Sequence, residues 1–116
     1  MSITGVSSDL IRGHIDTIIL RVLYETDNYG YEIIKSIKRN SNGLYELKEP
    51  SLYTSLKRLE KGKMVSSYWG DKTQGGRRKY YQITPQGEAA YLKAIEQWHL
   101  AKKVIDLLVE GNEDNG

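Results

Sequence analysis

The sequence contains no cysteine and no phenylalanine, and only two of its 116 residues are histidine. Without cysteine, disulfide scaffolds, cysteine-based zinc sites and cysteine nucleophiles are excluded. His14 and His99 are distant in sequence, and neither has metal-ligand spacing with a carboxylate. No pairing of a nucleophile with a base can be named. We therefore expect no catalytic residue, no metal and no cofactor, and a protein that is not an enzyme.

A long apolar run is also missing. The stretch HIDTIILRVL, residues 14–23, is interrupted by Asp16 and Arg21, so it is neither a signal peptide nor a membrane span. We expect a cytoplasmic protein that does not bind membranes. Its length suits one domain with one hydrophobic core.

Net positive charge is lacking outside one central segment. Residues 51–83 carry eight Lys or Arg against two Asp or Glu, whereas the residues before and after this segment are net negative. Such clustering is typical of a surface that binds a polyanion, and the alternative is a basic face that is merely solvated.

Apolar residues that recur at steps of three and four predict three helices in the first half of the chain. Asn28 is the expected N-cap of the second helix, and Pro50 opens the third, where its missing N–H costs nothing. Leu52, Leu56 and Leu59 should be buried. The predicted helices span residues 8–25, 29–39 and 50–61.

The remaining elements follow from turn residues and β-formers. Asn42-Gly43 is a turn signal within 40–48, which also holds a candidate short strand. Aromatic and β-branched residues predict a hairpin of two strands, 64–69 and 79–83. Thr84 and Pro85 then open a last helix over 85–110, in which Gly87 is a mild local weakness.

This order predicts a mostly α fold with a small β-hairpin, the winged helix-turn-helix. In that fold the third helix enters the major groove of DNA, and the hairpin loop, the wing, reaches phosphates or the minor groove. We expect a DNA-binding domain over 1–83 with the N-terminal helix included, a long dimerisation helix over 84–110 and a disordered tail over 111–116.

The wing sequence GDKTQGGRRKYYQIT explains the central charge. Its glycines allow the backbone to approach a duplex, and its cations can neutralise phosphates. A nucleotide-binding glycine loop is the alternative, but the P-loop and dinucleotide spacings are absent. The DNA-contacting residues expected here are Gln74, Gly75, Gly76, Arg77, Arg78 and Lys79.

The last helix carries an apolar seam with heptad spacing. One helix cannot hide such a seam against its own small domain, so we expect a homodimer with the partner's first helix packed alongside. Packing on the first helix of the same chain is the alternative. The expected interface residues are Tyr91, Ile95, Trp98, Ala101, Ile105 and Leu108.

The segments DNYGYEIIK, PSLYTSLKRLEKGKMV, SYWGDKTQGGRRKYYQIT and PQGEA resemble the PadR family of bacterial transcriptional regulators. The likeness runs from about residue 8 to residue 110 and is greatest to short members that include multidrug-responsive repressors. Thr54 stands where proline often follows the Leu-Tyr pair of such proteins.

The resemblance implies roles for residues of the second and third helices. Ser51, Tyr53 and Thr54 would meet base edges, while Tyr53 has partial burial under the wing as its alternative. The implied backbone contacts are Lys57 and Arg58, together with Tyr31 and Lys35 on the second helix.

The resemblance also implies a ligand site around Trp98, where planar aromatic compounds slip between two-fold-related tryptophans in multidrug-responsive relatives. Simple interface packing is the alternative for Trp98. Lys102, one turn later, would disfavour cations unless Asp16 points inward. The implied lining is Trp98, Ala94, His14, Asp16 and Thr17.

The resulting hypothesis is a sequence-specific repressor that binds an inverted repeat of double-stranded DNA as a homodimer, associates with the nucleoid when bound, and is released by a planar aromatic effector. The alternatives are a regulator without a small-molecule ligand and a protein-interaction module that uses the long helix. Steep salt dependence of DNA binding would separate the regulator from the module.

Overall fold

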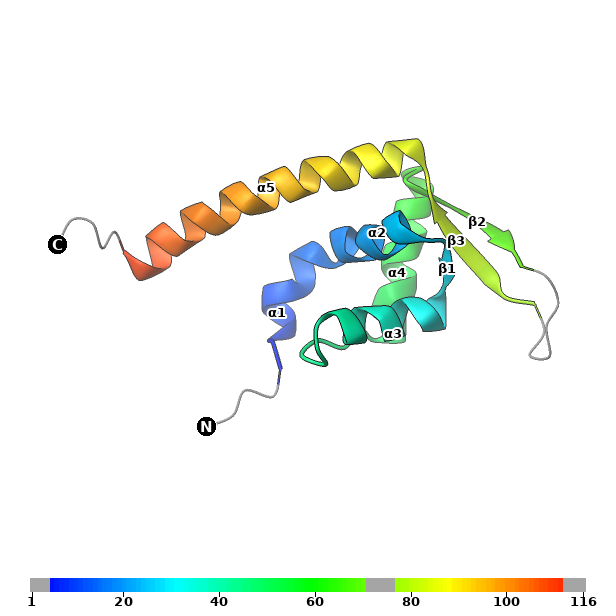
Figure 1. Cartoon of the computed structure of the whole chain (residues 1–116), viewed down its shortest axis with the longest axis horizontal. Coiled ribbons are helices and arrows are strands. Elements are labelled where there is room, and N and C mark those ends of the chain that lie inside the picture. Colours follow the sequence, from blue (N-terminus) through cyan, green and yellow to red (C-terminus); the bar gives the residue numbers. More distant parts are fainter. Residues whose placement is uncertain (1–4, 71–76, 112–116) are drawn as a thin grey trace.

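The computed structural model describes residues 5–70 and 77–111. Four α-helices, a 3₁₀ helix and a three-stranded antiparallel sheet form one small domain among the described residues, and a long last helix extends from it (Figure 1). In chain order the elements are α1 (Ser8–Ile11), the 3₁₀ helix η1 (Arg12–His14), α2 (Ile15–Glu25), β1 (Asn28–Tyr29), α3 (Gly30–Asn40), α4 (Glu49–Lys61), β2 (Val65–Trp69), β3 (Lys79–Ile83) and α5 (Pro85–Glu110).

The first predicted helix is not continuous, so that prediction was wrong in detail. η1 interrupts it around Gly13, and His14 has φ −113° and ψ 1°, outside the helical range. Glycine weakens a helix interior by about 1 kcal/mol relative to alanine, and α1 buries no residue that would offset this. The result is a short α1 joined at an angle to the well-packed α2.

One predicted helix cap and one predicted strand also need correction. Asn28 does not cap the second helix but lies in β1, which pairs with β3 through Asn28–Tyr81 and Tyr29–Tyr80. A strand of two residues has no periodicity, so nothing in the sequence announced it. The candidate strand within 40–48 is absent, because Asn42 and Gly43 take positive φ values of 55° and 79° and turn the chain.

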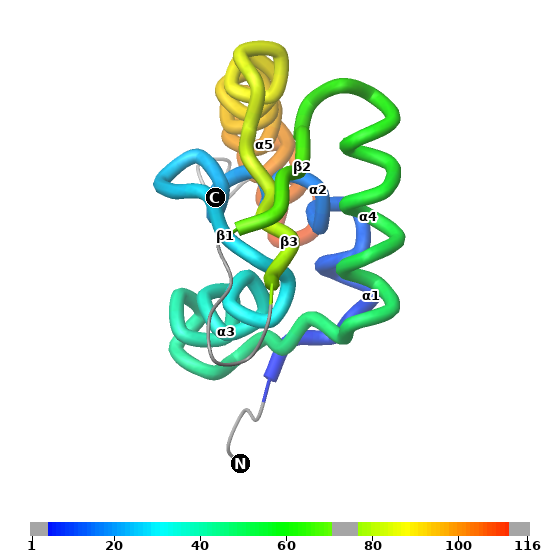
Figure 2. Tube along the Cα trace, turned by 90° about the vertical axis from the view of Figure 1, so that its right-hand side faces the viewer, coloured from blue at the N-terminus to red at the C-terminus, as the bar shows by residue number. Residues whose placement is uncertain are grey.

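The core lies between α2, α3, α4 and the sheet. Figure 2 shows the strands running between α5 and α3, with α4 to one side. The leucines of α4 at positions 52, 56 and 59 are buried, as predicted, against α2 and α3. Each such side chain contributes about 1.5–3 kcal/mol. Their burial fixes which faces of α4 remain outside.

α5 begins against the turn that follows α4. Thr84 caps it by accepting a hydrogen bond from the Gly87 amide at 3.0 Å, and the Thr84 hydroxyl donates to the Lys63 carbonyl at 2.7 Å. A β-carbon at Gly87 would collide with the Met64 carbonyl oxygen, so glycine is required there and is not a mere weakness. None of the helices among the described residues is long and apolar enough to cross a membrane.

Candidate nucleic-acid interface

α4 presents two exposed rows of side chains opposite its buried leucines. Residues three and four apart share a helix face, so the exposed positions separate into two rows. We call Ser51, Thr54 and Arg58 the first row, and Tyr53, Lys57 and Lys61 the second row; all six are exposed. The sequence-predicted contacts of α4 are therefore split between two neighbouring faces.

Tyr53 in the second row lies across the start of α3. A β-carbon at Gly30, the first residue of α3, would collide with the Tyr53 hydroxyl. Tyr53 is nonetheless 47% exposed, and it lines a hollow of about 390 Å³ together with Arg78 and Lys79 at the base of the wing. Its ring is thus partly covered by α3 and the wing while one side faces solvent.

The cations at the base of the wing rest on aromatic rings. The guanidinium carbons of Arg77 and Arg78 lie 5.7 Å and 4.6 Å from the ring centroids of Trp69 and Tyr29, respectively. Such contacts orient a cation while leaving its charge available to a ligand. The Nζ of Lys79 is 5.6 Å from the Tyr81 ring, and that of Lys35 is 5.4 Å from Tyr31.

These cations are exposed: three lie at the β2–β3 hairpin, and Lys35 lies on α3. Figure 1 shows the β2–β3 hairpin at the end opposite to the C-terminal part of α5, with α3 and α4 beside it. Tyr31 and Lys35 are exposed on α3. The predicted wing residues Gln74, Gly75 and Gly76 lie outside the described residues.

Arg58 in the first row is bound to an acidic residue of α2. Its Nε donates to Oδ2 of Asp16 at 2.9 Å, and its Nη2 donates to Oδ1 at 2.7 Å. This hydrogen bonding raises the pKa of the Arg58 guanidinium. Asp16, which the family resemblance implied would line the space near Trp98, instead faces α4, because it occupies the side of α2 that packs on α4.

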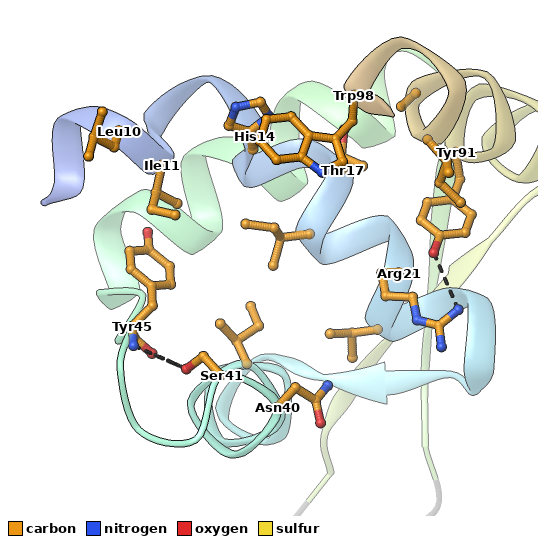
Figure 3. Close-up of a pocket in the computed structure, with 15 residues that line it drawn as sticks. Leu10, Ile11, His14, Thr17, Arg21, Asn40, Ser41, Tyr45, Tyr91 and Trp98 are labelled. Atoms are coloured by element: carbon orange, nitrogen blue, oxygen red, sulfur yellow. Dashed lines mark hydrogen bonds between the residues drawn. The ribbon is translucent and has the colours of Figure 1, made fainter. Parts of the chain in front are cut away.

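The space near Trp98 is a mostly apolar cavity of about 450 Å³ between α1, η1, α2, α3 and α5 (Figure 3). His14 and Trp98 meet edge to face, with ring centroids 4.9 Å apart. Arg21 lies in the wall, where its Nη1 donates to the Tyr91 hydroxyl at 3.3 Å. The structure thus brings together His14, Thr17, Ala94 and Trp98, and these four also line an adjoining cavity of about 480 Å³.

The predicted seam of α5 divides into a covered part and an open part. Tyr91 is 6% exposed, and Ile95 packs on the same core, so both lie against the chain's own α2 and not at a free surface. Ile105 and Leu108 are 49% and 79% exposed. The large apolar residues exposed from the middle of α5 onwards are Trp98, Leu100, Val104, Ile105, Leu107, Leu108 and Val109.

Over residues 5–70 and 77–111, no group of three or more His, Asp or Glu side chains is placed to hold a metal ion. Sequence reasoning identified the cations but missed their aromatic supports, Tyr29 and Trp69. The one available signal was the alternation of aromatic residues with cations around the wing.

Comparison with known proteins gives a consistent result. The family model of the transcriptional regulator PadR-like family matches residues 19–93. A transcriptional regulator from Clostridium thermocellum is 50% identical, with a TM-score of 0.80 over 87% of this chain and 95% of that chain. A PadR family transcription regulator from Clostridium difficile is 36% identical, with a TM-score of 0.73 over 84% of this chain and 99% of that chain.

Bacillus subtilis PadR in complex with operator DNA shares the fold at 20% identity, with a TM-score of 0.63 over 70% of this chain and 46% of that chain. The predicted winged helix-turn-helix with a long last helix is confirmed. The chain therefore belongs to the PadR-like family of transcriptional regulators, which are not enzymes.

Proposed function

We propose that this protein is a sequence-specific repressor that binds an inverted repeat of double-stranded DNA as a homodimer. The observation that carries the proposal is the set of exposed cations at the hairpin, Arg77, Arg78 and Lys79, which contact aromatic rings beside the exposed faces of α4. The complex of Bacillus subtilis PadR with operator DNA supports it at the level of the fold.

In this proposal α4 enters the major groove from its N-terminal end. Ser51 and Thr54 in the first row are short hydroxyl donors and acceptors, which suit contacts with base edges. Arg77, Arg78 and Lys79 neutralise phosphates on either side of the groove, with Lys35 and Lys57 adding backbone contacts. Tyr53 and Tyr31 contact the DNA backbone between these two sets of contacts.

Dimerisation completes the proposed site, because one domain reads only half of an inverted repeat. Two recognition helices related by a two-fold axis meet half-sites one or more helical turns apart. The open part of the α5 seam, from Trp98 to Val109, supplies an apolar surface for the partner. We expect the repressor to act in the cytoplasm on the nucleoid.

A salt titration of binding to duplex DNA tests the proposal. If about eight phosphates are contacted per dimer, a plot of log K against log salt should have a slope near −7. The DNA should first be selected from a random library by the protein itself. A slope shallower than about −2 would contradict the proposal and favour a module that binds other proteins through α5.

A second proposed function is the sensing of a planar aromatic compound, and the cavity beside Trp98 favours it. The cavity is lined mostly by apolar side chains, and its wall also holds His14, Arg21, several neutral polar side chains and the Trp98 indole. Among the described residues, none that lines it is a carboxylate. Asp16 faces Arg58, and Lys102 bonds to Asp106 at 3.2 Å. These charges favour a neutral or anionic planar compound over a cation.

Trp98→Ala tests this second function. The variant should lose binding of planar aromatic compounds, measured by calorimetry, because the indole supplies the flat surface on which they stack. Trp69→Ala, which removes the other tryptophan, is the matched control and should keep ligand binding. Release of DNA also requires that the ligand prefer the DNA-free form, since equal affinity shifts nothing.

The sensing proposal has two ways to fail. Equal ligand affinity of wild type and Trp98→Ala would show that Trp98 does not bind the ligand and serves only in interface packing. Ligand binding that leaves DNA affinity unchanged would remove the regulatory claim even if the compound occupies the cavity.

A further inference from the structure

The Arg58–Asp16 pair differs from the Arg12–Asp9 pair beside α4. It joins residues 42 positions apart, links α2 to α4 and uses two hydrogen bonds. By contrast, Arg12–Asp9 is a local pair at spacing i,i+3 whose side chains are 71% and 76% exposed. The Arg58 and Asp16 side chains are 58% and 34% exposed, so this pair is partly shielded from water, and its two hydrogen bonds give it a more defined geometry.

A third contact fixes the guanidinium further. Nη2 of Arg58 also donates to the hydroxyl of Ser55 at 3.1 Å, and Ser55 is buried one turn earlier on α4. Arginine presents its N–H groups as a rigid planar fork. Bonds to Nε and Nη2 therefore determine where Nη1 points. Nη1 makes no hydrogen bond to any residue in the described ranges.

The Nη1 edge of the Arg58 guanidinium lies on the same helix face as the rest of the first row of α4. Arg58 lies four residues after Thr54 and seven after Ser51, so it follows them along one helix face. All three side chains line one groove of about 410 Å³ beside α1 and η1. Lys57 and Lys61 lie on the neighbouring face, where no comparable carboxylate bond holds them in the described structure.

We infer that Asp16 is a positioning residue for DNA recognition. It orients Arg58 so that the Nη1 edge meets the duplex in one direction, in the same register as Ser51 and Thr54. Arg58 then makes a contact that depends on sequence register, in contrast to the DNA-backbone contact that the family resemblance implied. The inference rests on the proposed DNA-binding function.

Preorganisation gives Asp16 its effect. A free arginine side chain loses up to about 2 kcal/mol of rotamer entropy when one conformation is imposed. Because Asp16 and Ser55 impose that conformation before DNA arrives, the cost falls on folding and not on binding. In a non-matching complex the fixed donor cannot follow a displaced acceptor. The pair should therefore raise the ratio of specific to non-specific affinity more than it raises affinity itself.

Asp16→Asn tests the inference. The ratio of affinities for the selected duplex and for a scrambled duplex should fall about tenfold, the loss typical of one hydrogen bond with a charged partner. Affinity for the scrambled duplex should stay equal or rise, because the substitution removes a negative charge. Asp9→Asn makes the same charge change beside the same groove, and it should leave the ratio unchanged.

Two further variants separate positioning from general stability. Arg58→Lys keeps the charge but cannot form the two-pronged contact, so it should lower the ratio as Asp16→Asn does. In an Arg58→Ala background, Asp16→Asn should cause no further fall, because Asp16 acts through Arg58. Thermal unfolding of each variant identifies those that fold as wild type does.

The inference is overturned if folded Asp16→Asn keeps the wild-type ratio, or if Asp16→Asn still lowers the ratio when Arg58 is alanine. If Asp16→Asn does not fold, Arg58→Lys decides, and a wild-type ratio in that variant overturns the inference. Absence of salt-dependent binding by wild type would instead refute the proposed function.

Discussion

Substitution of Ile105 by aspartate is expected to leave the protein monomeric and to abolish its preference for palindromic DNA. Ile105 is 49% exposed on the single chain and lies in the open part of the α5 seam. In the proposed dimer the partner covers it, and a carboxylate buried there without a partner costs several kcal/mol. Analytical ultracentrifugation should show the change in mass directly.

Loss of the dimer should weaken palindrome binding by a factor on the order of 100 or more, because the second half-site no longer gains from being tethered to the first. The protomer should remain folded, since Ile105 lies beyond the residues that form the core. Circular dichroism should therefore show nearly unchanged helix content.

His99→Asp is the matched control. His99 is exposed on α5 and shares a polar face with Lys103 and Asp106, four and seven residues further along. The His99→Asp variant introduces the same carboxylate outside the seam and should remain dimeric. A dimeric Ile105→Asp protein would show that the open part of α5 is not the interface.

Periodicity and turn chemistry were sufficient for the larger elements. Pro50 in α4 and Thr84-Pro85 in α5 mark where these helices begin, and they do so through local backbone chemistry alone. The leucine spacing of α4 then identifies its buried face without knowledge of its neighbours. These features depend on residues within a few positions of one another, which is why the sequence was enough.

The features that were missed depend on contacts between distant segments. β1 exists because β3 supplies hydrogen-bond partners more than 50 residues later. Gly87 is needed because the Met64 carbonyl lies against it, and Gly30 because the Tyr53 ring lies across it. No local pattern reports such approaches.

The same limit applies to the functional residues. Clustered charge predicted the wing cations, yet the Arg58–Asp16 pair spans 42 positions and has no motif. The heptad spacing of α5 showed that one face must be covered, but not by what. Tyr91 is covered by the chain's own α2, whereas Leu108 on the same seam is left open. Apolar spacing cannot distinguish a partner's helix from the chain's own.

Replacement of both Arg77 and Arg78 by alanine should weaken DNA binding on the order of 100-fold at physiological salt. The double variant removes four cations per dimer, so the slope of log K against log salt should change from about −7 to about −3.5. Phosphate contacts carry little sequence information, so selected and scrambled duplexes should lose affinity about equally. Both arginines are exposed at the hairpin, so the fold should persist.

Replacement of the same two residues by lysine separates charge from geometry. Lysine keeps the cation over Trp69 and Tyr29 but lacks the planar guanidinium. If the wing acts by charge alone, the lysine variant should retain the wild-type slope and nearly all of the affinity. If the lysine variant instead loses affinity for the selected duplex but not for the scrambled one, an arginine of the wing reads a narrow minor groove. The wing then contributes to specificity. An unchanged slope in the alanine variant would show that the wing does not meet phosphates, and the central positive charge would need another partner.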